Sequence, residues 1–148
     1  MIEQISDKAL HREYVKRFTI PHGEIFNCSE TVGDHLRAYF SKDPYKEVLV
    51  VIFLNGRNGH LRTETISEGT ITTSSVFPRE IIRKALEYGA VALILGHNHP
   101  SGNPTPSSDD QNITNKIVNA CKTVDITVHD HIIMAGGTYT SFADKGLI

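Results

Sequence analysis

Two short apolar runs without polar alternation predict buried strands in the middle of the chain. The first, residues 47–54, has the sequence EVLVVIFL, and the second, residues 90–95, has the sequence AVALIL. Continuous aliphatic and β-branched runs of this length are typical of strands that are covered on both faces of a sheet. Weaker strand patterns occupy residues 60–66, 70–75, 126–128, 131–134 and 138–142, with a Gly136-Gly137 turn before the last of them.

Apolar residues at helical spacing predict helices at about residues 6–18, 29–40, 78–88 and 108–122. Ser29 is a candidate N-cap for the second helix, whose buried stripe is formed by Val32, Leu36 and Phe40. The first helix is expected to present Leu10, Tyr14, Val15 and Phe18 on one face.

The two later helices carry clear end signals and apolar faces. Pro78 suits the first turn of the helix at 78–88, and Gly89 suits its C-terminal end. The residues expected to face inward are Ile81, Ile82, Ala85 and Leu86 in this helix, and Ile113, Ile117, Ala120 and Cys121 in the helix at 108–122.

Strands and helices alternate through the middle of the chain, and the chain ends in a hairpin. This order predicts an α/β (α+β) fold, in which a mixed sheet is flanked by helices. A length of 148 residues predicts one domain, residues 1–148. Its core is expected at about 28–148, with an N-terminal extension at 1–25 that the Pro21-His22-Gly23 break separates from it.

Composition narrows the function classes. The net charge is −2, so there is no excess of basic residues to attract nucleic-acid phosphates, and direct nucleic-acid binding is not expected. The longest apolar run, residues 48–54, is far shorter than the roughly 20 residues that span a bilayer. The N-terminus is polar and resembles no secretory signal, so we expect a cytoplasmic protein in which Cys28 and Cys121 are reduced.

The segment at residues 97–110, HNHPSGNPTPSSDD, carries the most unusual chemistry. His97 and His99 end a buried strand, and residues two apart on a strand project from the same face, as a pair of metal ligands would. A loop rich in proline and glycine then leads to Ser107 and a helix with Asp110 on its first turn. If this helix folds back, the result is a His₂-carboxylate site with an open fourth position, which is typical of catalytic zinc. Manganese or iron can also use these ligands.

Each part of this segment also has an ordinary structural explanation. An H-x-H pair alone is a weak signal, and Asp110 can simply be a carboxylate favoured at a helix N-terminus. Ser107 and Asp110 also have the spacing of a capping box. The order of strand, paired histidines, loop, serine and aspartate makes the combination informative.

With Ser107 and Asp110, this segment matches the JAMM metalloprotease signature, in which H-x-H is followed by seven residues, a serine, two residues and an aspartate. The stretches that resemble the RadC-like JAB domain, a member of this JAMM/MPN superfamily, are GHNHPSG (96–102), PRE (78–80), VDI (124–126), DH (130–131) and SFADKGLI (141–148). The resemblance extends from about residue 47 to residue 148. It implies a JAMM/MPN fold with a cytidine-deaminase-like architecture.

The resemblance also implies roles for individual residues. His97, His99 and Asp110 would bind a zinc ion. Family members use an upstream glutamate as a general base, and by its position Glu47 resembles that residue. Ser107 would help to bind the oxyanion that forms during hydrolysis. Two other glutamates that precede the metal loop, Glu64 and Glu68, are alternatives to Glu47.

The function implied is therefore a zinc-dependent hydrolase, of metallopeptidase or isopeptidase type, that acts on a protein or peptide. One alternative is an interaction module that keeps the fold without catalysis. Another is a DNA-repair accessory protein, the role associated with the RadC name. Many family members carry an N-terminal helix-hairpin-helix segment, whose glycine pattern this chain does not show. The sequence indicates neither the substrate nor the oligomeric state.

Other metal-site patterns do not match. Zinc nucleoside deaminases need H-x-E and P-C-x-x-C, but His97 is followed two residues later by His99 and the sequence has no C-x-x-C. The H-E-x-x-H of thermolysin-like proteases is also absent. His129 and His131 repeat the H-x-H spacing, but no proline- and glycine-rich loop with an acidic residue follows them. They are therefore not expected to form a ligand set.

Overall fold

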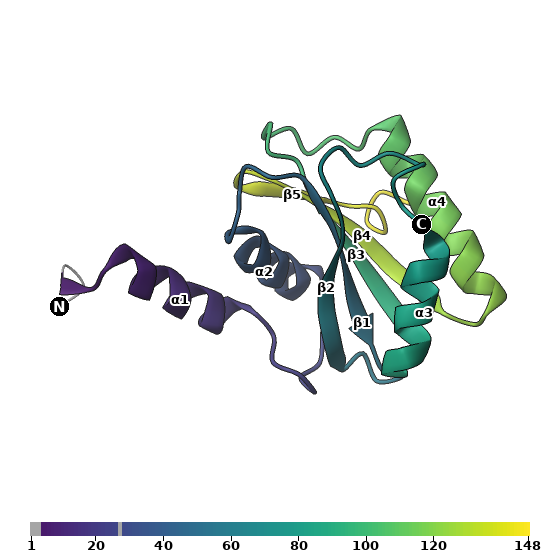
Figure 1. Cartoon of the computed structure of the whole chain (residues 1–148), viewed down its shortest axis with the longest axis horizontal. Coiled ribbons are helices and arrows are strands. Elements are labelled where there is room, and N and C mark those ends of the chain that lie inside the picture. Colours follow the sequence, from purple (N-terminus) through teal and green to yellow (C-terminus); the bar gives the residue numbers. More distant parts are fainter. Residues whose placement is uncertain (1–3, 27) are drawn as a thin grey trace.

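The computed structural model describes residues 4–26 and 28–148, and within these residues a single mixed sheet forms the centre of the fold (Figure 1). Its strand order is β2-β1-β3-β4-β5. β1 pairs antiparallel with β2 and β3, β3 pairs parallel with β4, and β4 pairs antiparallel with β5. The strands are β1 (Val48–Leu54), β2 (His60–Glu68), β3 (Ala92–Asn98), β4 (Thr127–Ala135) and β5 (Thr138–Ser141).

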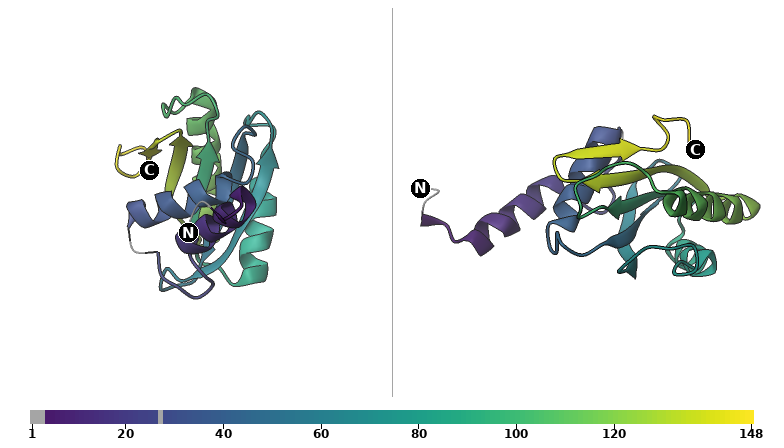
Figure 2. Two further views of the ribbon diagram at one scale, coloured as in Figure 1. Left: turned by 90° about the vertical axis from the view of Figure 1, so that its left-hand side faces the viewer. Right: turned by 90° about the horizontal axis from the view of Figure 1, so that it is seen from above.

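Helices cover both faces of the sheet (Figure 1). α2 (Ser29–Phe40) packs on one face, and α3 (Pro78–Tyr88) and α4 (Ser108–Thr123) pack on the other. α1 (Asp7–Phe18) projects away from the sheet and buries none of its residues (Figure 2). Within the described residues, no helix combines the length and the apolar character needed to cross a membrane.

β1 shows why the apolar runs lack alternation. Leu49, Val51 and Phe53 belong to the core cluster beneath α3 and α4. The intervening residues Val50 and Ile52, with Leu54, belong to the cluster beneath α2. Each of these side chains is fully buried and contributes about 1.5–3 kcal/mol of hydrophobic stabilisation. The prediction of central strands with both faces covered is confirmed.

α2 lies unusually close to β3 at Gly96. A Cβ atom added to Gly96 would be 2.5 Å from Leu36 Cδ2, which is well inside van der Waals contact. Only glycine therefore allows α2 to pack at this depth. Because Gly96 directly precedes His97, this packing also sets the distance between α2 and the end of β3 that carries the candidate ligands.

Two strand predictions are wrong. Residues 70–75 form bends and turns, in which Ser75 Oγ donates to the Thr72 carbonyl and accepts from the Thr72 amide. Hydroxyl groups that bond to nearby backbone compete with sheet pairing, and this competition removes the predicted strand. Residues 126–128 and 131–134 are not separate strands, because β4 continues through His129 and Asp130 with a register shift opposite Leu93 and Ile94.

Three helix details also differ from prediction. Ser29 is the first residue of α2, and Cys28 occupies the N-cap position without a side-chain cap bond. Leu86 is 64% exposed. At about 100° per residue it lies far around α3 from Ile81, so it points to solvent. The predicted apolar face of α1 is not buried, since Leu10 and Phe18 are nearly half exposed.

Candidate metal centre

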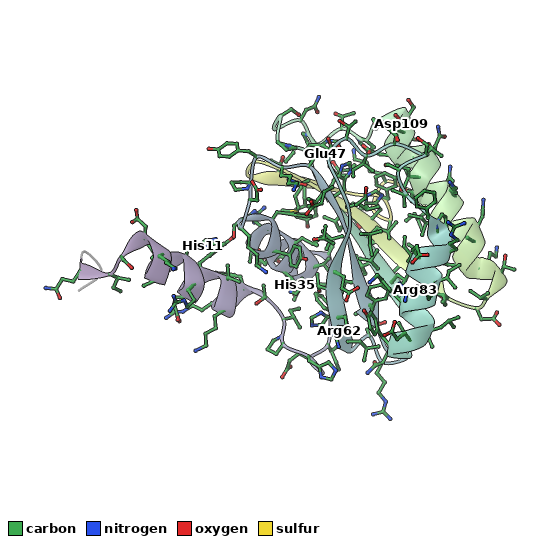
Figure 3. The ribbon with its side chains drawn as sticks, viewed as in Figure 1. His11, His35, Glu47, Arg62, Arg83 and Asp109 are labelled. Atoms are coloured by element: carbon green, nitrogen blue, oxygen red, sulfur yellow. The ribbon has the colours of Figure 1, made fainter. Side chains whose placement is uncertain are left out.

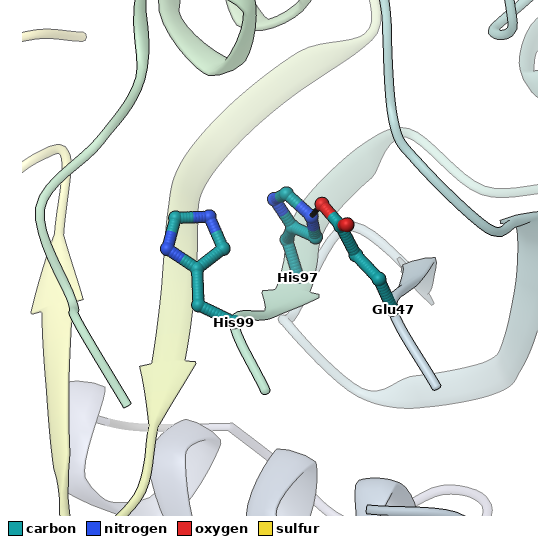
Figure 4. A group of neighbouring side chains, drawn as sticks. All are labelled: Glu47, His97 and His99. Atoms are coloured by element: carbon teal, nitrogen blue, oxygen red, sulfur yellow. Dashed lines mark hydrogen bonds and ion pairs between the residues drawn. The ribbon is translucent and has the colours of Figure 1, made fainter. Parts of the chain in front are cut away.

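The end of β3 brings His97 and His99 side by side (Figure 4). β3 runs to Asn98, and the His99 amide still donates to the Met134 carbonyl of β4, so the extended backbone continues past the strand end. The two imidazole rings are 4.8 Å apart between centroids and perpendicular. His97 is 1% exposed, whereas His99 faces partly outward. The predicted pairing of the two histidines on one face is confirmed.

Glu47 reaches the same place from the start of β1. In the antiparallel register Leu49 lies opposite His97, so the residues just before β1 lie beside the end of β3. Glu47 Oε1 is 2.8 Å from His97 Nε2 (Figure 4). Ligand atoms of Glu47, His97 and His99 all lie within 4.8 Å of one another, which is close enough to hold one metal ion.

Asp110 contacts both histidines from the first turn of α4. Its Oδ1 is 3.2 Å from His97 Nδ1, and its Oδ2 is 3.1 Å from His99 Nε2. The loop between β3 and α4 therefore folds back as the sequence predicted. On the other side of the His99 ring, Nδ1 donates to the Asn103 carbonyl at 2.8 Å. This bond orients the ring and leaves Nε2 as the atom available to a metal.

Ser107 caps α4 and holds Asp110 in place. The Asp110 amide donates to Ser107 Oγ at 3.0 Å, and the Ser107 amide donates to Asp110 Oδ2 at 2.8 Å. The capping box anticipated as the ordinary explanation is therefore present. A hydroxyl that accepts one bond can still donate its own proton. The Ser107 hydroxyl therefore keeps the donor that the predicted oxyanion role needs.

Asp110 is ionised at neutral pH. Its carboxyl group is 2% exposed, and this burial alone would raise its pKa. The close contact with His97 and the hydrogen bond from the Ser107 amide outweigh the burial and hold the pKa of Asp110 well below its usual range. The centre therefore contains one fixed negative charge between two imidazoles.

The two alternative bases are engaged elsewhere. Glu64 accepts a hydrogen bond from Tyr88 Oη at 2.6 Å and forms an ion pair with Lys84 Nζ at 2.9 Å. Glu68 pairs with Lys46 Nζ at 2.7 Å. Of the three candidate glutamates, Glu47 is the one that contacts His97. We call Glu47, His97 and His99, which could hold a metal ion, the metal group.

Sequence reasoning missed Asn98, which positions Glu47. Its Oδ1 accepts from the Val48 amide and its Nδ2 donates to the Lys46 carbonyl, both at 2.7 Å. These two bonds hold the backbone on either side of Glu47 beside the end of β3. Asn98 is 5% exposed, so the bonds form away from water. The sequence signal for Asn98 was its place between His97 and His99. A polar residue between two ligands on a strand points to the opposite face of that strand.

His131 and Thr114 contact the candidate ligands from the buried side of the centre. The Thr114 hydroxyl donates to the Asp110 carbonyl at 2.7 Å, and it therefore accepts from His131 Nδ1 at 2.6 Å. The His131 ring stacks against His97, with centroids 6.1 Å apart. Burial and then the neighbouring His97 lower the pKa of His131 to about 3, so it is neutral. His129 lies apart and bonds to Asn58.

Comparison with known protein families agrees with this geometry. A family model described as "RadC-like JAB domain" matches residues 26–147. The chain belongs to this family. The mixed sheet with helices on both faces is consistent with a JAB/MPN domain.

Relatives of this RadC-like JAB domain occur in several bacteria. A UPF0758 protein of Paracidovorax citrulli is 40% identical over 130 residues, which cover 88% of this chain and 54% of the relative. A UPF0758 protein of Vibrio vulnificus is 43% identical over 121 residues, 80% of this chain and 54% of the relative. One of Pseudoalteromonas translucida is 44% identical over 124 residues, 84% and 55% of the two chains. The chain thus spans about half the length of these relatives, whose names state no activity.

In this RadC-like JAB domain the metal group opens into a cavity of about 650 Å³. Glu47, His99, Ser107 and Asp110 line it, so four of the five residues singled out from the sequence face one shared space, and the fifth, His97, is buried beneath them. Figure 3 shows Glu47 and Asp109 at the same end of the sheet. The volume is within the range of about 300–1,000 Å³ that is usual for ligand sites.

Proposed function

We propose that this RadC-like JAB domain is a zinc-dependent hydrolase of peptide or isopeptide bonds. The observation that carries the proposal is the convergence of Glu47, His97 and His99, whose ligand atoms lie within 4.8 Å of one another. The ionised Asp110 contacts both histidines. An acidic residue beside two imidazoles in a cavity of this size is the arrangement that metal-dependent hydrolysis requires.

The donor set fits zinc. His97, His99 and Asp110 would hold the ion, because two imidazoles and one carboxylate supply three ligands of the type that catalytic zinc sites use. His97 Nδ1 is buried and has no well-directed hydrogen bond among the described residues, although it lies 3.2 Å from Asp110 Oδ1. When bound, zinc lowers the pKa of water to about 7 and polarises a substrate carbonyl.

The remaining residues would move protons and stabilise charge. Glu47, partly exposed at the edge of the cavity, accepts a proton from the attacking water and passes it to the leaving amine. The Ser107 hydroxyl donates to the carbonyl oxygen as that oxygen gains negative charge. Asn98 keeps Glu47 in reach through the two backbone bonds on either side of it.

The test combines metal content with hydrolysis. Wild-type protein supplied with zinc and then dialysed should retain about one zinc per chain and release new amino groups from a mixture of unfolded peptides. Asp110→Asn keeps an oxygen that can accept the Ser107 amide but removes the charge, so it should lose both zinc and activity. Asp7→Asn makes the same change on the first turn of α1, away from the cavity, and should behave as wild type. Stoichiometric zinc in Asp110→Asn, or a wild-type protein that never retains zinc, would contradict the proposal.

A further inference from the structure

A second cavity adjoins the candidate metal centre on the α2 side of the sheet. Its volume is about 340 Å³. We call it the α2 cavity and define it by Arg37, Phe40, Pro44, Tyr45, His99 and Met134. Tyr45 and His99 also line the larger cavity over the metal group. A peptide that lies across the metal group can therefore place one of its residues in the α2 cavity.

The walls of the α2 cavity are mostly apolar. Phe40 and Met134 form buried surface, with exposures of 7% and 5%, and Pro44 and Tyr45 form the exposed rim. Tyr45 is 90% exposed, although most of its ring is hydrocarbon. An apolar side chain that enters this space leaves water and gains hydrophobic contact. The occupant expected from the walls is thus a bulky aliphatic or aromatic side chain.

Arg37 adds one positive charge to this apolar space. Among the described residues, no lysine and no carboxylate lines the α2 cavity. Arg37 Nη1 forms an ion pair with Asp34 Oδ1 at 3.6 Å, a distance longer than a hydrogen bond. Arg37 Nε is buried and has no hydrogen-bond partner among the described residues. The Arg37 side chain as a whole is 38% exposed, so its terminal Nη groups are available to bind a carboxylate in a bidentate manner.

We propose that the α2 cavity is a substrate subsite beside the scissile bond, and that it takes a bulky apolar residue accompanied by a carboxylate. This inference rests on the proposed hydrolase function, because the subsite is defined by its position next to the metal group. The carboxylate can be the C-terminus of a peptide or the side chain of a neighbouring Asp or Glu. Both sources present the same chemistry to Arg37.

Binding of short peptides to the full 148-residue chain supplied with zinc tests the subsite without hydrolysis. The probes are acetyl-Gly-Leu, its C-terminal amide, acetyl-Gly-Gly and acetyl-Leu-Asp-amide, each followed by ¹⁵N NMR titration. We expect acetyl-Gly-Leu to bind about tenfold more tightly than either acetyl-Gly-Gly or the leucine amide, since each lacks one of the two recognised groups. The Gly102 and Gly136 amide signals, which report on the cavity lining, should shift. Acetyl-Leu-Asp-amide shows whether an acidic side chain replaces the terminal carboxylate.

Two matched arginine variants distinguish binding by Arg37 in the α2 cavity from a general effect of positive surface charge. Arg37→Gln should weaken acetyl-Gly-Leu binding about tenfold and leave the leucine amide unaffected. Arg83→Gln removes an exposed arginine on α3, on the opposite face of the sheet, and should bind as wild type (Figure 3). Both variants remove a surface charge without opening the core, and thermal melting verifies that each remains folded.

The outcomes distinguish the subsite from the hydrolase function. Equal binding of all four peptides, equal binding by Arg37→Gln and wild type, or signal shifts elsewhere would overturn the subsite even in an active enzyme. Selective, Arg37-dependent binding supports the recognition chemistry. If such binding occurs in a protein that holds no zinc and hydrolyses nothing, the proposed function fails while the cavity is retained as a peptide-binding site.

Discussion

At the scale of single residues, Glu47 depends on interactions that lie far away in the sequence. Its carboxylate contacts His97, which is 50 residues further along the chain. Its backbone is held on both sides by the Asn98 side chain. The H-x-H segment therefore has two roles. Its outer residues are candidate ligands, and its central residue positions the candidate base.

The first prediction concerns the base itself. Glu47→Gln retains a side chain of the same shape but cannot accept the proton of the attacking water. We expect zinc content to remain at the wild-type level and kcat to fall by about 10²–10⁴-fold, the usual contribution of a general base. Elemental analysis and steady-state kinetics measure the two quantities. Glu64→Gln is the control, and a fall in kcat for that variant alone would transfer the role to Glu64.

The second prediction tests positioning by Asn98. Asn98→Ala removes both backbone bonds while leaving Glu47 and the ligands in the sequence. We expect kcat to fall about tenfold with little change in zinc content, because the base is less well placed while the ligands are unchanged. Asn115→Ala, an exposed change on α4, should have no effect. A parallel loss of zinc in Asn98→Ala would show that Asn98 supports the whole centre and not Glu47 in particular.

Residue spacing revealed the histidine pair and Asp110 but not their supports. His97, His99 and Asp110 lie within 14 residues, so strand periodicity and one loop were enough to group them. Asn98, Thr114 and His131 act through tertiary contacts with other elements. Local patterns do not contain that information. Ser107 shows a further limit, because one spacing fits both a helix cap and an oxyanion donor.

At the scale of elements, the apolar patterns predicted the central strands and α2, α3 and α4 because burial dictates their periodicity, whereas α1 forms although none of its residues is buried. The errors fall where polar groups decide the backbone, as in the turn of Thr72 and Ser75 or the continuous β4 through His129 and Asp130. The close approach of α2 to β3 was also invisible in the pattern. It depends on one glycine, Gly96, facing Leu36.

The third prediction tests this close approach. Gly96→Ala places a methyl group about where Leu36 now packs, so α2 must move outward. We expect the free energy of unfolding to decrease by about 1–3 kcal/mol, the usual cost of overpacking a core. Urea denaturation measures it. Gly137→Ala is the control, because a Cβ there meets nothing within 4 Å and its φ is not positive.

A rescue variant shows whether the cause is steric. Leu36→Val in the Gly96→Ala background removes a methylene group next to the new methyl. It should recover part of the lost stability, although Leu36→Val alone is destabilising. If the two losses simply add, the two side chains do not compete for space and the packing explanation is wrong.

At the scale of the whole molecule, two histidines tie the N-terminal segment to the body. The Ile20 amide donates to His35 Nδ1 at 2.7 Å, and His35 Nε2 therefore donates to Thr63 Oγ1 at 2.9 Å. His60 Nε2 lies 2.8 Å from the same hydroxyl. Figure 3 shows His35 on α2, on the side from which α1 projects. His35 must be uncharged for this arrangement, because Nδ1 of a protonated His35 cannot accept the Ile20 amide.

The fourth prediction is that stability falls in mild acid because of His35. Burial, and then the nearby His60, lower the pKa of His35 to about 4, against an unfolded value of about 6.5. Between these two values the unfolded chain binds more protons, so the stability that His35 contributes is present above pH 6.5 and is lost as pH falls toward 4. At pH 5 the loss is on the order of 2 kcal/mol relative to pH 7.5.

Comparison with His35→Gln isolates this effect from the other groups that titrate in acid. The glutamine can accept the Ile20 amide and donate to Thr63, but it cannot be protonated in this range. Urea denaturation of both proteins in chelator, at pH 7.5 and pH 5, cancels the contributions of Asp110 and His131, which have the same sign. The variant should therefore lose clearly less stability on acidification than wild type. Equal losses would mean that His35 is already protonated in the folded protein at pH 5, and that the Ile20 bond does not hold the N-terminal segment to the body at that pH.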